Sequence, residues 1–241
     1  GWPADSHTYG GSFLYHLPNN QLALGYVSGL DYRDPQYKPW EAFQQWKNHP
    51  TVKPLLEGGN ILSAGARAIV TGGWQALPKV EMPGALLIGD TAGLLNVPKI
   101  KGTHQAIRSG MLAAEHLAAH GLDPAGFDAR LRGSAVMAEL KKVRNIKPGF
   151  KKGLWFGMLN AAWETATGGA SPWTLHNTPD WSALHRLGQY EEPKRDYVTR
   201  ELPPRDRLAG VYFAATEHDE DQPVHLHVAD TRVCIERCTT E

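Results

Sequence analysis

The chain has few cysteines and no net charge, and each feature argues against one class of structure or function. Only two cysteines, Cys234 and Cys238, occur in 241 residues, which excludes a disulfide framework. Basic and acidic residues number 25 each, so the charge balance argues against non-specific nucleic-acid binding as the main activity. With 41% hydrophobic residues, the composition is that of a globular chain rather than a disordered one.

Several sequence signals are also missing. There is no secretory signal and no apolar run of about 18 residues, so we expect no membrane-spanning helix. A nucleophile elbow, a P-loop and an HExxH motif are all absent, which leaves hydrolase and nucleoside triphosphatase functions without support. The chain begins with Gly1-Trp2 and ends in CIERCTTE, and we expect it to be a segment of a longer protein.

The first 50 residues predict a β-hairpin followed by a helix. The stretch from His7 to Tyr32 indicates two strands joined by a Pro-Asn-Asn turn. The segment Pro39 to Pro50 carries three aromatic residues at helical spacing, which we interpret as a core stripe: Trp40, Phe43 and Trp46. Further on, residues 60–80 indicate another pair of strands around Thr71-Gly72-Gly73.

Before the first strand stands the short motif HTYGGSF. Gly10 and Gly11 follow Tyr9 and would expose main-chain amides and carbonyls to a ligand resting on them. The alternative interpretation is a bulge or a tight bend.

A strand, loop and helix are predicted in LLIGDTAGLLNVPKIKGTHQAIRSGMLAAEHLA. Gly84 to Gly89 is typical of a short buried strand, because its apolar residues do not alternate with polar ones. A helix should begin near Thr103, capped by that side chain and closed by Gly121. Its expected apolar face consists of Ile107, Met111, Ala114 and Leu117.

The loop between that strand and that helix is a candidate ligand site. Asp90 follows the strand directly, where open α/β sheets bind their ligands, and its carboxylate suits a sugar-like hydroxyl that donates to it. The free amides at the helix start favour an electron-rich group. FAD has both features, in its ribityl chain and its ring; the alternative is a plain strand-to-helix turn.

A basic segment rich in lysine precedes an aromatic helix. Its cations have no acid among them: Lys141, Lys142, Arg144, Lys147, Lys151 and Lys152. Immediately behind it lie the apolar residues Leu154, Trp155, Phe156, Met158, Leu159 and Trp163. This order suits a helix lying in the plane of a membrane, with cations on anionic headgroups and aromatics at the interface. The alternative is a solvated basic face followed by a core helix.

The last third of the chain gives weaker signals. Beyond Gly168-Gly169 it is rich in proline and tryptophan to about Tyr190, which indicates a connecting region, and Gly210 to Val228 ends in an alternating pattern typical of a strand. His225 and His227 would share one face of that strand, near His218, Asp219 and Asp221, but no third ligand can be fixed and we predict no metal site. The CxxxC spacing of the two cysteines suits neither a zinc knuckle nor a thioredoxin-type pair.

Five motifs together resemble the electron transfer flavoprotein:ubiquinone oxidoreductase family over essentially the whole chain. They are HTYGGSFLYH, LEGG, SAGARA, LIGDTAGLLNVPKIKGTHQAIRSGMLAAE and HDEDQPVHL, and the NVPKIKGTH part is the most specific. Members of that family carry FAD and one 4Fe-4S cluster. They pass electrons from electron transfer flavoprotein to ubiquinone at the surface of the mitochondrial inner membrane, on its matrix side, or of the bacterial cytoplasmic membrane.

The resemblance implies a role for three groups of residues. Those expected to bind FAD are Gly89, Asp90, Gly93, Asn96, Val97, Gly102 and Thr103. The quinone-contacting loop would be Tyr9, Gly10 and Gly11. The membrane-docking residues would be Lys151, Lys152, Trp155, Phe156 and Leu159. Because the cofactors carry the redox chemistry, no catalytic side chain is expected.

The resemblance also implies a mixed α+β fold, in which part of a glutathione-reductase-like Rossmann domain for FAD is interleaved with a β-sheet quinone-binding domain. A ferredoxin-like cluster domain would then begin. The expected divisions are 1–80 for the quinone domain, 81–135 for the last strand and helix of the FAD domain, 136–175 for the membrane-docking helices, and 176–241 for the connector and start of the cluster domain.

Two expected features of the family are missing from these residues. The GxGxxG fingerprint that holds the FAD pyrophosphate does not occur, and Cys234 and Cys238 do not match the cluster cysteines, so we expect the cluster ligands outside this chain. Two alternatives stay open: a flavin-dependent reductase of isoprenoid lipids, such as a geranylgeranyl reductase, and a membrane-surface interaction module without redox activity.

Overall fold

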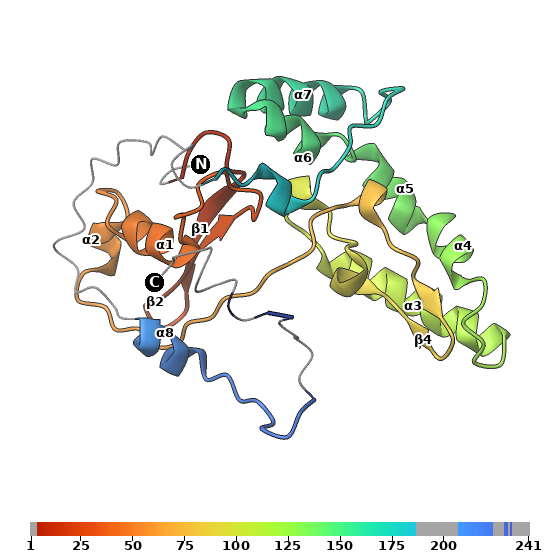
Figure 1. The fold of residues 1–241 in the computed structure, drawn as a ribbon, viewed down its shortest axis with the longest axis horizontal. Helices are drawn as coiled ribbons and strands as arrows, with labels where there is room; N and C mark the ends of the chain where they lie inside the picture. Colours follow the sequence, from red (N-terminus) through yellow and green to blue (C-terminus); the bar gives the residue numbers. More distant parts are fainter. Residues whose placement is uncertain (1–3, 187–206, 224–228, 231, 233–241) are drawn as a thin grey trace. The chain divides into compact units, whose positions relative to one another are not determined.

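The computed structural model describes residues 4–186, 207–223, 229–230 and 232. The chain divides into two compact units, one comprising Gly1–Gly58 with Arg67–Pro204 and the other Gly59–Ala66 with Arg205–Glu241. Within the described residues the fold mixes short sheets and helices (Figure 1), which confirms the expected α+β class at that coarse level.

Two small antiparallel sheets contain the four described strands, which are β1 (Gly10–Leu17), β2 (Gln21–Ser28), β3 (Glu81–Met82) and β4 (Ala85–Leu86). The described α-helices are α1 (Pro39–Lys47), α2 (Lys53–Leu56), α3 (Thr103–Ala119), α4 (Phe127–Arg132), α5 (Ala135–Lys142), α6 (Ile146–Gly149), α7 (Leu154–Ala166) and α8 (Arg207–Ala214). Single 3₁₀ turns complete this part of the chain: η1 (Trp74–Ala76), η2 (Gly89–Ala92), η3 (Val97–Lys99), η4 (Phe150–Lys152) and η5 (Asp180–Ala183).

The predicted hairpin near the N-terminus is confirmed. β1 and β2 pair from Gly10 with Ser28 to Leu17 with Gln21. Asn19 and Asn20 both take positive φ angles in the turn, a region that asparagine tolerates better than most residues. The predicted helix at Pro39 is also confirmed as α1, and it packs against β2 with Trp46 buried, as the aromatic stripe indicated.

The strand prediction around Thr71-Gly72-Gly73 is wrong. Residues 59–73 form no regular element, and only the turn η1 follows them. Their backbone and side chains are instead held by other parts of the chain. The amide of Asn177 donates to the Gly72 carbonyl over 2.7 Å, and the Lys147 ammonium donates to the Thr71 hydroxyl.

The expected buried strand at Gly84 to Gly89 is mostly absent as well. Only Ala85 and Leu86 are in β4, which forms a hairpin with β3, and Ile88 is exposed. A strand that is apolar throughout needs cover on both faces. Among the described residues, β4 pairs only with the two-residue strand β3, and no larger sheet surrounds it. The apolar residues of this segment are therefore not all buried.

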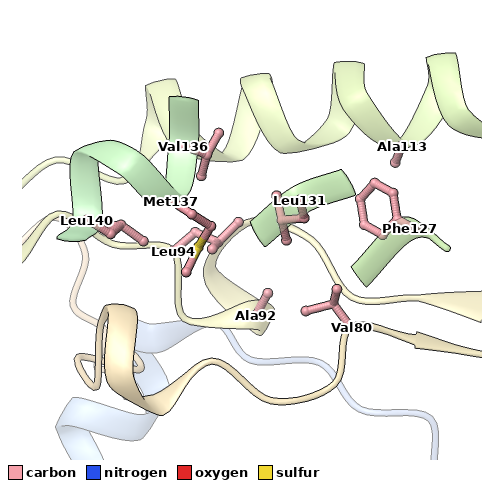
Figure 2. Close-up of a cluster of buried hydrophobic side chains, with 9 residues drawn as sticks. All are labelled: Val80, Ala92, Leu94, Ala113, Phe127, Leu131, Val136, Met137 and Leu140. Atoms are coloured by element: carbon pink, nitrogen blue, oxygen red, sulfur yellow. The ribbon is translucent and has the colours of Figure 1, made fainter. Parts of the chain in front are cut away.

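The main hydrophobic core lies among α3, α4, α5 and the segments beside them (Figure 2). Its buried members are Val80, Ala92, Leu94, Ala113, Phe127, Leu131, Val136, Met137 and Leu140. Leu94 comes from the loop that follows Asp90, so the core fixes the far end of that loop.

Helix α3 confirms the predicted helix, but its buried face differs from the expected one. The buried residues are Gln105, Ser109, Ala113 and His116, whereas Ile107 and Met111 are 59% and 58% exposed. The helix closes as predicted after Ala119: Gly121 has a φ of +62° and the Leu122 amide donates to the Leu117 carbonyl over 3.0 Å. Three of the four residues of the expected apolar face, Ile107, Met111 and Ala114, are therefore exposed within the described part of the chain.

The basic and aromatic segment begins at the end of α5 and continues through α6, η4 and α7, with α7 packed on α6. In the smaller unit, α8 precedes the stretch for which a strand was expected, and its Phe213 carbonyl accepts from the Ala64 amide over 3.1 Å. The predicted strand at the end of that segment, with His225 and His227, lies outside the described residues.

Candidate functional site

The Asp90 loop is held in a defined shape by backbone bonds. Gly89 and Gly93 take φ angles of +59° and +78°, which favour glycine, and the turn η2 lies between Ile88 and Gly93. The Gly93 amide donates to the Asp90 carbonyl over 2.9 Å, and the Gly89 amide donates to the Ser109 hydroxyl over 3.0 Å. The loop is thus fixed to the buried face of α3.

The Asp90 carboxylate lies close to the beginning of α3. A Cβ added at Gly102 would stand 2.8 Å from Asp90 Oδ1, so glycine is the residue that leaves room for the carboxylate there. Asp90 and Thr103 are both exposed. A ligand can therefore reach the carboxylate and the first turn of the helix together.

The start of α3 carries no side-chain cap, which corrects the predicted Thr103 cap. The N-cap residue is Gly102, and no side chain accepts from the first amides of the helix. Thr103 lies one position too far along to cap them, because it is already helical. The uncapped amides and the helix dipole together make this end attractive to an electron-rich group.

Asn96 has a structural environment that the sequence did not reveal. Its side chain is fully buried, its amide donates to Glu139 Oε1 over 2.8 Å, and its oxygen accepts from the Lys99 amide over 3.3 Å. Val97 begins the next turn, η3. The side chain of Asn96 is therefore occupied within the protein, and the loop from 96 to 101 is fixed by it.

Glu139 is the residue that sequence reasoning missed. Burial raises the pKa of its carboxyl, but hydrogen bonds from Lys99, Asn96 and His104 outweigh that effect and lower the pKa from 4.5 to about 2. The Lys99 ammonium stands 3.1 Å and the His104 ring 3.2 Å from Glu139 Oε1. Helix α5 is thereby tied to the loop and to the first turn of α3. No motif marks this glutamate, since its partners are 35 to 43 residues away.

Gln105 lies on the same first turns of α3 and is fully buried. Neither its amide nitrogen nor its oxygen has a hydrogen-bond partner within the part of the chain that the structure describes. An unpaired buried amide destabilises a fold, so this side chain is an exception to the otherwise paired interior of the site.

The Tyr9 loop lies against the segment that precedes α7. The Tyr9 and Phe150 rings pack edge to face with centroids 5.4 Å apart, and burial raises the pKa of the Tyr9 hydroxyl. A Cβ at Gly10 would stand 2.1 Å from the Val27 carbonyl oxygen, whereas a Cβ at Gly11 would meet nothing within 4 Å. Gly10 is therefore required by the hairpin, and the space beside Gly11 is open.

Helix α6 connects the two candidate sites. It contacts η3, which follows Asn96, and Phe150 comes directly after it. A cavity of about 20 Å³, enough for one water molecule, is lined by Val97, Pro98, Thr71 and Lys147. Burial lowers the pKa of the Lys147 ammonium, and Asp31 and Asp180 oppose that shift.

Helix α7 buries polar residues and exposes apolar ones. Its inward residues include Gly157, Asn160 and Glu164, and the Asn145 amide donates to Glu164 Oε1 over 3.0 Å. Its exposed residues are apolar: Leu154, Trp155, Phe156, Met158, Leu159 and Trp163. A water-soluble helix usually buries the opposite face.

The lysines near α7 do not form one cationic surface. Lys151 donates to the Thr178 hydroxyl over 2.5 Å, and Lys147 is bound to Thr71. Lys152 lies over the Phe156 ring at 4.9 Å, on the apolar side of α7. Of the two lysines expected to dock, Lys152 is thus beside the aromatic residues and Lys151 is held by a neighbouring segment.

In the part of the chain that the structure describes, no three His, Cys, Asp or Glu side chains gather as metal ligands would. Cys234, Cys238, His225 and His227 lie outside it. No described helix combines the length and the hydropathy needed to cross a membrane.

Comparison with known proteins gives two family matches and a set of long relatives. Residues 1–69 match the model "ETF-QO, ubiquinone-binding", and residues 203–241 match "Electron transfer flavoprotein-ubiquinone oxidoreductase, 4Fe-4S". The mitochondrial electron transfer flavoprotein-ubiquinone oxidoreductases of Homo sapiens and Sus scrofa are 40% and 42% identical over 98% of this chain, and that of Arabidopsis thaliana is 44% identical over 97%.

The chain spans 41% of the length of the two mammalian relatives and 37% of the plant one. The two models fall at its two ends, and the relatives cover the residues between them. Over nearly its whole length the chain is therefore similar to electron transfer flavoprotein-ubiquinone oxidoreductases, and it matches two of their domain models.

Proposed function

We propose that the complete protein passes electrons from reduced electron transfer flavoprotein, through a 4Fe-4S cluster and FAD, to ubiquinone at the surface of a membrane. In this proposal it is an electron-transferring-flavoprotein dehydrogenase, bound peripherally to the mitochondrial inner membrane on its matrix side or to the bacterial cytoplasmic membrane. This chain would supply the quinone loop, part of the FAD site and the docking helix.

One observation carries the proposal: the outward apolar face of α7 begins four residues after Phe150, which packs on Tyr9. A polyprenyl quinone resides in lipid, so its headgroup should be received beside the surface that enters the bilayer. The Tyr9 loop and α7 have that relationship. A face with Trp155 79% exposed and Leu159 73% exposed is also suited to the interfacial region of a bilayer.

The residues at Asp90 fit a flavin. The exposed carboxylate can accept from a ribityl hydroxyl, and the uncapped amides of α3 can face the electron-rich edge of the ring. When bound, FAD would supply the redox chemistry, and the protein would position it and tune its potential. Gly102 leaves room for the carboxylate, and Glu139 holds the loop from 96 to 101.

The quinone loop would act through its main chain. The Tyr9 carbonyl accepts from the Gly29 amide over 2.6 Å and is therefore occupied, whereas the space at Gly11 is open to a quinone oxygen. The ring of Phe150 would keep Tyr9 in position and help to exclude water from the loop.

Membrane docking is tested with the full-length protein and two matched tryptophans. Trp155→Ser should lower partition onto liposomes and leave the reduction of a soluble dye unchanged. Trp181→Ser is the control, because Trp181 is 78% exposed but lies in η5 and not in α7. Equal partition of the two variants would contradict the docking role.

The cofactors are tested by visible and low-temperature EPR spectra of the full-length protein. We expect a flavin band and a reducible 4Fe-4S signal. Flavin without a cluster would favour the isoprenoid-lipid reductase, and liposome binding with neither cofactor would leave a membrane-surface module. Asp90→Ala should lower the retained FAD, whereas Asp123→Ala, at the other end of α3, should not.

A further inference from the structure

An open groove lies between the end of α5 and the segment that follows α7. Its volume is about 630 Å³, and its walls come from residues 138–144, from residues 169–174 and from Trp74. It is separate from the Asp90 loop and from the Tyr9 loop, since no residue of either lines it.

The groove is cationic. Lys141, Lys142 and Arg144 line it, and none of its ten lining residues is acidic. Lys141 and Lys142 are exposed, and the Lys141 ammonium lies over the Trp74 ring at 5.8 Å. Within the described residues neither lysine is paired with a carboxylate, so both charges are available to a bound anion.

Arg144 builds the wall of the groove rather than serving a ligand. Its guanidinium donates to the carbonyls of Lys141, Gly169, Ser171 and Trp173 and to the Thr174 hydroxyl, at 2.6 to 3.1 Å. These bonds use all five of its N–H groups. They fix residues 169–174 opposite α5, so the groove is held open by a buried arginine.

One hydroxyl adds a donor to the lysines. Thr174 is partly exposed and its Oγ1 accepts from Arg144 over 2.9 Å, so its own proton can be donated to a ligand. Ser171 is only 5% exposed and its Oγ accepts from the Trp163 indole over 3.2 Å, so it belongs to the wall. Two ammonium groups and one hydroxyl together suit a phosphate-type anion.

The groove adjoins the apolar face of α7. Trp163 is 55% exposed on that face, and its indole is bonded to Ser171 in the wall. A face that enters the interface would bring the groove to the depth of the headgroups. We propose that this groove binds the phosphate headgroup of an anionic phospholipid, and this inference rests on the proposed docking of α7.

Vesicle partition of the full-length protein tests the inference. The vesicles are phosphatidylcholine alone, or phosphatidylcholine mixed with phosphatidylglycerol. Lys141→Gln with Lys142→Gln should lower partition onto the mixed vesicles about tenfold and leave partition onto the neutral ones unchanged. Lys142→Glu alone should lower it in the same selective way.

The matched control is Lys79→Gln, which removes another exposed lysine from outside the groove. If Lys79→Gln weakens partition as much as the groove variants do, the loss comes from the lower net charge of the protein. That result would contradict a headgroup site in the groove. Loss on both vesicle types would assign the two lysines a structural role and would overturn the inference as well.

Other occupants give different results. Tight binding of inorganic phosphate without vesicles, with unchanged partition of the lysine variants, would assign the groove to a soluble anion. Unchanged partition with slower reduction by electron transfer flavoprotein would assign it to a protein partner. If Trp155→Ser leaves partition intact, the docking of α7 itself fails, which is a separate outcome from failure of the lysine variants.

Discussion

The ring of Tyr9 packs edge to face on the ring of Phe150, with their centroids 5.4 Å apart. Tyr9 precedes the first strand of the hairpin, and Phe150 precedes the exposed helix α7. One aromatic contact therefore joins the candidate quinone loop to the candidate membrane helix. Gly157 leaves room for it, because a Cβ there would stand 2.3 Å from the Phe150 ring.

Phe150→Ala should raise the KM for quinone in the full-length protein. The lost aromatic pair would let the Tyr9 loop move, at a cost of up to about tenfold in affinity. Steady-state quinone reduction and flavin content are the measurements, and flavin content should not change. Phe150→Tyr keeps the ring and should behave like wild type; a raised KM in that variant would show that the ring contact is not the cause.

Gly10 and Gly11 should respond differently to the same added methyl group. Gly10→Ala places a Cβ 2.1 Å from the Val27 carbonyl oxygen. This variant should lower the free energy of unfolding by about 1 to 3 kcal/mol. Gly11→Ala meets no atom within 4 Å, so it should fold normally.

Gly11→Val extends this comparison. Its larger side chain should depress quinone reduction while FAD stays bound, because it would occupy the space proposed for the quinone. Thermal unfolding and quinone turnover of all three variants are compared. Normal quinone turnover of Gly11→Val would contradict the proposal that the quinone binds beside Gly11.

Gly102→Ala should weaken FAD retention. Its Cβ would stand 2.8 Å from Asp90 Oδ1, which forces the carboxylate away from the first turn of α3. The released flavin is measured by absorbance after gel filtration. Gly110→Ala is the control, since a Cβ at this position on the same helix meets only Ile88, at 3.9 Å. Equal flavin content in both variants would contradict the role of Asp90.

Glu139→Gln should destabilise the protein at neutral pH and much less in acid. The pKa of Glu139 is lowered from 4.5 to about 2 in the folded chain, so its stabilisation is complete above pH 4.5 and is lost as the pH falls toward 2. The side chain is 21% exposed, and after solvent screening we expect an effect of about 1 to 2 kcal/mol. Thermal unfolding of both forms across this range is the measurement, and a difference that does not vary with pH would exclude the ionic contribution.

The sequence predicted the elements whose signals are local. The hairpin follows from the Asn19-Asn20 turn, α1 from the two prolines around an aromatic stripe, and α3 from its periodicity and from Gly121. It failed where burial depends on distant segments. Ile107 and Met111 have the right spacing for a core face, but Gln105 and Ser109 face inward, because the Gly89 amide needs the Ser109 hydroxyl.

By itself the sequence determined the loop at Asp90 and the helix after it, the Tyr9-Gly10-Gly11 motif and the aromatic content of α7, because turn residues and periodicity act over a few positions. Only the tertiary structure decided which lysines are free, which face of α7 is exposed and that Glu139 holds Asn96. Those outcomes depend on buried bonds between residues tens of positions apart, such as those of Arg144 and Asn145, and no local pattern records them.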